Sequence, residues 1–155
     1  MPGARFLDVA VGAALGALVL ACAGPAVAKT VLPGFHSPSG NITCVYVPHA
    51  GGATLRCEIA RADYAKTLQT RCMGPTGAGV DWHGFELGDA ARGEVTCSGG
   101  ILYNPGTQRP AYVNLLYGRT WRHGVFTCAS RTSGVTCRNR SGHGLFLSRQ
   151  AWRVW

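Results

Sequence analysis

Alternating apolar and polar positions predict a hairpin in the first half of the chain. In residues 53–60 the apolar side chains alternate with Thr, Arg and Glu, which is the period of a strand with one buried face. Residues 41–47 are rich in β-branched and aromatic side chains, and residues 48–52 contain one proline and two glycines. This order of strand, turn and strand predicts a hairpin in which Cys44 faces Cys57.

Short segments of the same kind recur along the rest of the chain. Residues 29–39 predict an extended lead-in, because their two prolines exclude a helix. Residues 61–71 predict a modest helix, since three apolar residues recur there at helical spacing. With 22 glycines in the chain, the pattern predicts an all-β fold: a small disulfide-stapled sandwich or barrel-like sheet with at most one short helix. The remaining predicted strands are 81–87, 94–98, 111–116, 125–130, 134–139, 145–148 and 151–155.

The N-terminus has the layout of an export signal. Arg5 precedes an almost uninterrupted apolar run from Val9 to Ala23, and the small residues at 26–28 suit a signal peptidase. The run is shorter than the ~20 residues that span a bilayer, although a membrane anchor or buried helix is the alternative. We therefore predict a signal peptide over 1–28, a single disulfide-rich β domain over 29–155, and a secreted or periplasmic protein. In a second interpretation, residues 19–22 form a lipoprotein cleavage site and Cys22 is lipidated.

Cysteine usage agrees with export. Of seven cysteines, six remain once Cys22 is removed or lipidated, and an even number in a short exported chain indicates disulfides. Fifteen pairings are possible, and we predict the local set because each pair brackets a hairpin or loop. No Cys-x-x-Cys spacing supports a zinc site, so we expect neither metal nor cofactor. The predicted bridges are Cys44–Cys57, Cys72–Cys97 and Cys128–Cys137.

The net charge of +8 is concentrated in the last third of the chain. Residues 29–100 contain six basic and six acidic side chains, whereas residues 101–155 contain eight arginines and no Asp or Glu. Such a field attracts anions, and arginine forks suit phosphate and carboxylate. The expected partners are an anionic envelope polymer, a lipid headgroup or an acidic protein. Nucleic acid is the weakest candidate, because an exported protein meets little of it. Alternatively, the charge only maintains solubility.

The most suggestive site lies in the basic tail, where His143 stands between two glycines. An imidazole on such open backbone is accessible to a ligand, and Arg138, Arg140 and Arg149 lie near it in the sequence. The alternative is a tight turn without a ligand. Catalysis would require His143 or His123 to work with a distant carboxylate such as Glu86 or Glu94. His123 itself, followed by glycine, is predicted to be a turn residue.

Two strings resemble a known family. Phe-His-Ser-Pro-Ser-Gly-Asn-Ile at 35–42, followed by Cys44, and Gly-His-Gly-Leu-Phe-Leu-Ser-Arg at 142–149 resemble an uncharacterised family of small exported bacterial proteins, a domain of unknown function. The resemblance implies an exported domain with paired cysteines and assigns no activity. We therefore interpret the chain as a non-enzymatic binding module for an anionic partner, recognised through its basic C-terminal third. A small secreted hydrolase, nuclease-like or acting on the cell wall, is the alternative.

Overall fold

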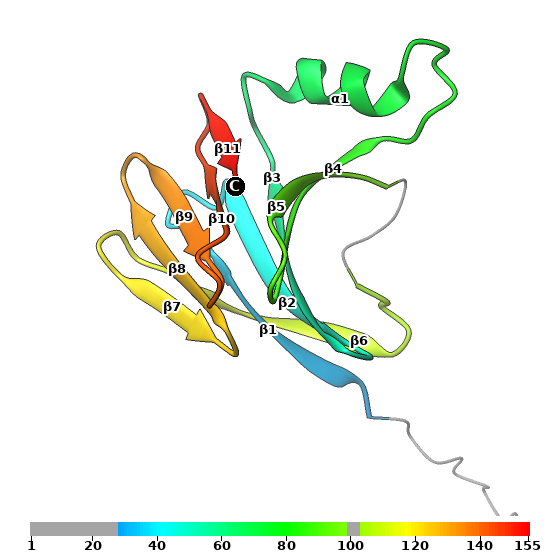
Figure 1. Cartoon of the computed structure of the whole chain (residues 1–155). Coiled ribbons are helices and arrows are strands. Elements are labelled where there is room, and N and C mark those ends of the chain that lie inside the picture. The colour runs from blue at the N-terminus through cyan, green and yellow to red at the C-terminus, as the bar shows by residue number, and fades with distance from the viewer. Residues whose placement is uncertain (1–27, 99–102) are drawn as a thin grey trace, which may run out of the picture.

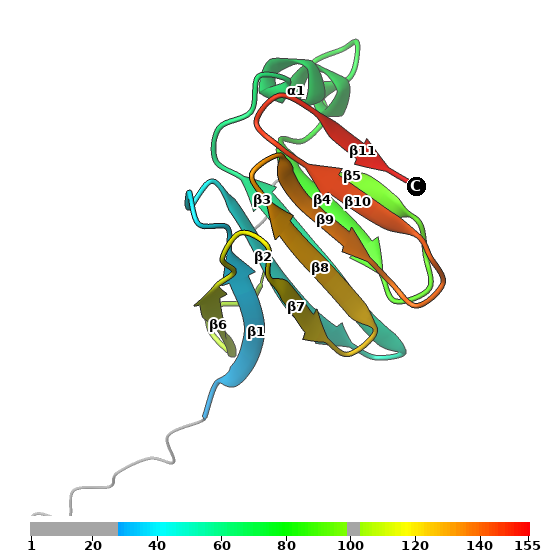
Figure 2. The ribbon, with the colours of Figure 1, turned by 90° about the vertical axis from the view of Figure 1, so that its left-hand side faces the viewer.

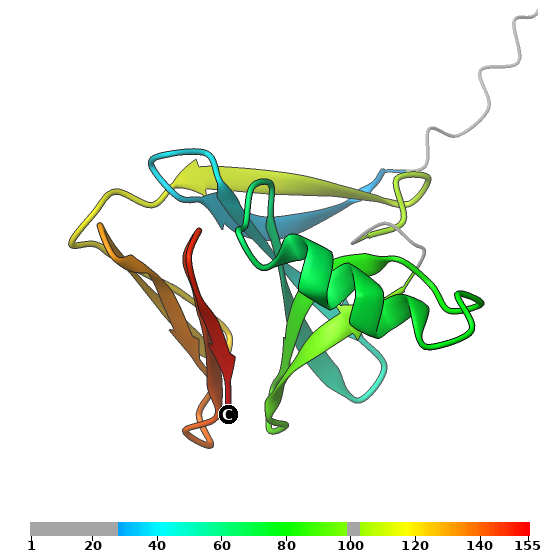
Figure 3. The same cartoon turned by 90° about the horizontal axis from the view of Figure 1, so that it is seen from above.

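Two β-sheets face each other in the computed structural model, with one helix at their edge (Figures 1 and 3). The structure describes residues 28–98 and 103–155, so the predicted signal peptide lies outside the described residues except for Ala28. The first sheet has the strand order β5-β4-β3-β2-β1-β6 and the second β11-β10-β9-β8-β7. This arrangement confirms the predicted all-β class with one short helix.

The first sheet consists of β1 (Thr30–His36), β2 (Ile42–His49), β3 (Gly52–Ile59), β4 (Trp82–Gly88), β5 (Gly93–Cys97) and β6 (Gln108–Asn114). The second consists of β7 (Thr120–His123), β8 (Phe126–Arg131), β9 (Gly134–Arg138), β10 (Gly144–Leu147) and β11 (Trp152–Val154). The helix α1 spans Ala65–Met73. Among the described residues, no helix has both the length and the apolar character needed to span a membrane.

The predicted hairpin of the first sheet is present as β2 and β3. Cys44 pairs with Cys57 in its register, and every second side chain of β3 is buried. The segment predicted as an extended lead-in is the strand β1, which pairs with β6 in parallel from Thr30 to His36. Proline excludes a helix but tolerates extended backbone, so the two prolines did not argue against a strand. Leu32 and Phe35 of β1 are completely buried.

The second sheet contains the other predicted hairpin, β8–β9, and one strand that the sequence analysis missed. Strand β7 has four residues, and its outward positions are polar, so it lacks an apolar run. His123, which we predicted to be a turn residue, ends β7 instead. Its ring lies 4.5 Å from that of Tyr46, so this histidine packs between the two sheets.

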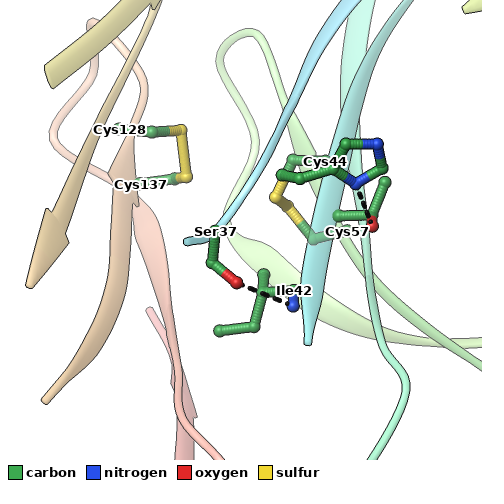
Figure 4. The surroundings of a disulfide bond; sticks show 8 residues. Ser37, Ile42, Cys44, Cys57, Cys128 and Cys137 are labelled. Carbon is green, nitrogen blue, oxygen red and sulfur yellow. Dashed lines mark hydrogen bonds between the residues drawn. A yellow bond between two sulfur atoms is a disulfide. The ribbon is translucent and has the colours of Figure 1, made fainter. Parts of the chain in front are cut away.

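All three predicted disulfides are confirmed, and two of them face each other in the core (Figure 4). Cys44–Cys57 joins β2 to β3, Cys128–Cys137 joins β8 to β9, and all four cysteines are 0% exposed. The sulfurs of Cys44, Cys57 and Cys137 lie within 4.8 Å of one another. Because each belongs to a disulfide, none is a thiolate that could bind a metal ion.

The third disulfide lies at the periphery. Cys72–Cys97 ties α1 to the end of β5, and Cys97 is exposed. The helix begins four residues later than predicted, because the preceding residues are held by other elements: the backbone N–H of Asp63 donates to the carbonyl of Arg149 at 2.9 Å. The Tyr64 hydroxyl also donates to the carbonyl of Ser148 at 3.1 Å. The start of α1 is therefore fastened to the second sheet.

We expect a mild reductant to open Cys72–Cys97 before the other two bridges under native conditions. Thiol–disulfide exchange requires a thiolate to reach a sulfur, and only this bridge has an exposed cysteine. Partial reduction, alkylation and peptide mass mapping would show label first on Cys72 and Cys97. Label appearing first on Cys44 or Cys128 would contradict the burial described above.

Candidate functional site

The turn that contains His143 is organised by Asn139. The Asn139 backbone N–H donates to the His143 carbonyl at 3.0 Å, and its side-chain oxygen accepts from the His143 backbone N–H at 3.1 Å. The Asn139 side-chain amide also donates to the carbonyls of Gly88 and Ala91, at 2.9 and 2.8 Å, in the β4–β5 turn of the other sheet. Asn139 is 6% exposed. It therefore closes its own turn and ties the two sheets together.

The glycines on either side of His143 serve this turn. Gly142 has φ +82, a conformation that favours glycine. Gly144 has no space for a side chain, because a Cβ would collide with the Cys137 carbonyl and the Trp155 ring. The hydrogen bonds that hold His143 in the turn come from its backbone. The turn interpretation thus accounts for both glycines, and the His143 imidazole is left partly exposed beside the basic residues.

Arg138 lies at the centre of a compact aromatic and basic cluster. Its guanidinium carbon is 5.3 Å from the centre of the Trp155 ring, and that of Arg153 is 5.4 Å from the same ring. These are cation–π distances. The Trp155 indole N–H donates to the Gly142 carbonyl at 3.0 Å, so the ring is held at a distance at which both arginines contact it. Both arginines are exposed at the surface, where a guanidinium can donate hydrogen bonds to an anion.

The cluster belongs to the outer face of the second sheet, which faces the viewer in Figure 2. Because side chains alternate along a strand, the buried residues of each strand identify the outward ones: Cys128 and Cys137 point inward, so Arg131 and Arg138 point outward. We call this surface the basic face. It consists of the outward residues Thr120, Arg122, Thr127, Ala129, Arg131, Thr136, Arg138, Phe146 and Arg153, with Trp155.

Register places the outward residues in two rows. Arg122, Thr127 and Arg138 stand at facing positions on β7, β8 and β9. In the next row, Thr136 of β9 faces Phe146, which in turn faces Arg153 of β11. Phe146 lies over Gly134, where a Cβ would meet its ring at 2.8 Å. Gly134 and Gly144 thus let the rings of Phe146 and Trp155 approach the strands closely on the face that carries the arginines.

The other predicted site residues are placed differently. Arg140 is exposed in the β9–β10 turn, close to His143. Arg149 lies beyond the opposite end of β10, where its Nε is 3.3 Å from the Asp63 carboxylate. There it lines a cavity of about 170 Å³ together with Arg131. The structure therefore gathers Arg138, Arg140 and His143 at one end of the sheet and separates Arg149 from them.

The carboxylates named for a catalytic role lie on the far side of the molecule. Glu86 stands opposite Glu94 on β4 and β5, and it is paired with Arg56 at 2.9 Å. His123 contacts Tyr46 and Trp121 in the space between the sheets, so the first sheet separates it from these outward carboxylates. Within residues 28–98 and 103–155, no ion pair joins His123 or His143 to a carboxylate.

Arg122 and Arg153 were not predicted to be site residues. Their signal in the sequence was present only as the excess of positive charge in the last third of the chain. Comparison with known proteins adds one match: the model of a family of unknown function (DUF6636) matches residues 13–154. No curated protein and no solved structure matches the chain.

Proposed function

Because the chain belongs to this family of unknown function, DUF6636, we infer its role from its own surfaces. We propose that it is a non-enzymatic module that binds an anionic polymer of the cell envelope or medium through the basic face. One observation carries the proposal. Arginines point outward from four of the five strands of the second sheet, and no Asp or Glu occurs from residue 101 onward. A surface that carries charge of one sign attracts and orients ligands of the opposite charge.

The location that the disulfides indicate supports an anionic polymer as the partner. Three disulfides are typical of an oxidising extracellular or periplasmic location. The proposal includes a signal peptide over 1–28 that delivers residues 29–155 to that location, with lipidation of Cys22 as the alternative form of export. Anionic polysaccharides and phosphate-containing polymers are abundant in such places, whereas nucleic acid is not.

The spacing of the arginines favours a polymer over a single headgroup. Arg122, Arg138 and Arg153 are carried by β7, β9 and β11, so consecutive ones are two strands apart. Two interstrand spacings amount to about 10 Å. Repeated charges along an extended chain match such a series, whereas one lipid headgroup meets a single arginine. The rings of Phe146 and Trp155 on this face give sugar units between the charges an apolar surface.

We expect the double substitution Arg138→Ala with Arg153→Ala to weaken binding to an anionic polysaccharide about tenfold. Two charge-assisted contacts are lost, and exposed ones are worth about 0.5–1 kcal/mol each. The probe is polygalacturonate, with dextran as its neutral counterpart, measured by calorimetry over a series of salt concentrations. The apparent affinity of the unchanged protein should fall steeply with salt, and that of the variant less steeply.

A matched control is the double substitution Arg71→Ala with Arg109→Ala. Arg71 is in α1 and Arg109 in β6, both are exposed, and the variant has the same net charge as the first one. It should bind polygalacturonate nearly as well as the unchanged protein. Equal losses in the two variants would show that only net charge matters. Tighter binding to anionic vesicles than to the polymer would assign the face to lipid headgroups and overturn the proposal.

A further inference from the structure

A row of polar side chains crosses the outer face of the first sheet, on the opposite side of the molecule from the basic face. His36, Thr43 and Glu58 occupy facing positions on β1, β2 and β3. Nδ1 of His36 lies 2.8 Å from Oγ1 of Thr43. The adjacent residues Phe35, Cys44 and Cys57 are buried in the core, so these three side chains point outward.

A bulge in β4 adds His83 to this row. Pairing with β5 passes from Trp82↔Cys97 to Phe85↔Val95, so His83 and Gly84 oppose one residue of β5. Gly84 has φ +102, and a Cβ there would collide with the Cys57 carbonyl. Bulges of this kind redirect a side chain and are frequent beside binding sites. Here Nε2 of His83 comes to 3.2 Å from Oε1 of Glu58.

The two side chains open onto a pocket of about 230 Å³. Its volume is below the range of about 300–1,000 Å³ that is typical of sites for drug-sized molecules, so it fits one small ring. Glu58 is the only carboxylate among the lining residues, and no Arg or Lys lines the pocket. Its walls are formed by Asn41, Thr43, Glu58, Ile59, Ala60, Trp82, His83 and Gly84.

The walls are held in place by neighbouring elements. The Trp82 indole N–H donates to the Gly84 carbonyl at 2.9 Å, and its backbone N–H donates to Oε1 of Gln69 in α1 at 3.0 Å. Asn41 donates to the Arg61 carbonyl at 3.0 Å and accepts from its N–H at 2.9 Å. A site fixed in this way loses little conformational entropy when a ligand binds.

The electrostatics of the pocket differ from those of the basic face. Burial, together with the charges of Tyr103 and the Glu58 carboxylate, raises the pKa of the Tyr112 phenol to about 12. The Tyr112 ring lies 4.3 Å from that of His36, so the field of Glu58 extends along the row. A carboxylate accepts several hydrogen bonds and repels anions. The pocket therefore selects ligands that donate hydrogen bonds.

We propose that this pocket binds a single uncharged sugar ring. Its hydroxyl groups donate to the carboxylate oxygens of Glu58 and hydrogen-bond with the His83 imidazole, while Trp82 provides an apolar wall. This site is separate from the basic face and goes beyond the proposed recognition of an anionic polymer.

The test is an NMR titration of the disulfide-bonded protein with glucose and with N-acetylglucosamine. At least one of them should cause saturable shifts of the Trp82 indole N–H and of the His83 and Gly84 amides, with the Trp155 indole N–H unchanged. Glu58→Gln should weaken this binding about tenfold, because a hydrogen bond to a charged group is lost. The control Glu94→Gln removes an exposed carboxylate from the same face outside the pocket and should change the affinity less than about twofold.

Several outcomes would overturn the sugar site. These are the absence of saturable shifts at Trp82 with both sugars, equal losses in Glu58→Gln and Glu94→Gln, or tighter binding of methylammonium than of either sugar. Shifts at Trp155 in place of Trp82 would move sugar binding to the basic face. Arg138→Ala with Arg153→Ala should leave the titration unchanged, so failure here is distinguishable from failure of polymer binding.

Discussion

Replacing Cys44, Cys57, Cys128 and Cys137 together by alanine is expected to lower the free energy of unfolding by about 6 kcal/mol. The two bridges close loops of 13 and 9 residues, and loops of this size contribute about 3 kcal/mol each. The free energy of unfolding of a typical domain is about 5–15 kcal/mol, so the quadruple variant should lose a large part of its stability and unfold at a much lower urea concentration. Circular dichroism with urea titration measures this loss.

We expect a double variant that lacks only one of these two bridges to remain folded and to lose about 3 kcal/mol of its free energy of unfolding. The loss of about 6 kcal/mol is the additive value, and the measured loss should depart from it by about 0.5–3 kcal/mol, because sulfurs of the two bridges lie within 4.8 Å of one another and neighbouring sites couple to this extent. The control is Cys72→Ala with Cys97→Ala, which removes a bridge outside the core. If the quadruple variant unfolded at the same urea concentration as this control, the two facing bridges together would stabilise the sandwich no more than the peripheral bridge does.

Asn139→Ala is expected to lower the free energy of unfolding by about 3 kcal/mol. The substitution leaves the Gly88 and Ala91 carbonyls and the His143 N–H without their partner, and a polar group left unpaired in a buried place costs about 1–3 kcal/mol. The three penalties should not reach their full sum, since water gains access to the two turns. Urea unfolding followed by tryptophan fluorescence measures the change.

Asn139→Asp gives a sharper comparison at this site. The aspartate keeps an acceptor for the His143 N–H but has no amide donor, and it places a carboxylate against two carbonyl oxygens. It should be at least as destabilised as the alanine variant at neutral pH. Asn114→Ala, at an exposed position of β6, should change the stability by less than about 0.5 kcal/mol. An Asn139→Asp variant as stable as the unchanged protein would exclude the cross-sheet role of this side chain.

Local patterns explain which parts of the fold were predictable. The hairpins β2–β3 and β8–β9 arise from neighbouring segments, so alternation and turn residues suffice to predict them, and the facing cysteines then follow. Residues 29–39 were predicted to be extended but not to pair as a strand, because β6, the parallel partner of β1, is more than 70 residues away. Strand β7 was missed because four residues with two polar outward positions carry no periodic signal.

The candidate sites depend even more on distant contacts. The excess of arginine was evident from composition, but its arrangement on one face follows from the register of five strands. Arg138 and Arg153 lie close to the same tryptophan because of the path that β11 takes beside β10, and the sequence does not show that path. His83 and Glu58 are 25 positions apart in the sequence, and only the bulge at Gly84 brings them together. No spacing of residues in the sequence predicts either the arginine–tryptophan cluster or the His83–Glu58 pair.

The parallel pairing of β1 with β6 has a kinetic consequence. Thr30 is paired with Gln108 and His36 with Asn114. The first strand of the chain therefore pairs with a segment that lies nearly 80 residues further along the sequence. Hairpins close within microseconds, whereas contacts between distant segments dominate the folding time of a β protein. Docking of β6 is therefore expected to be the slow step. Until it occurs, β1 exposes an open backbone edge, and the newly made chain is most vulnerable to aggregation during that interval.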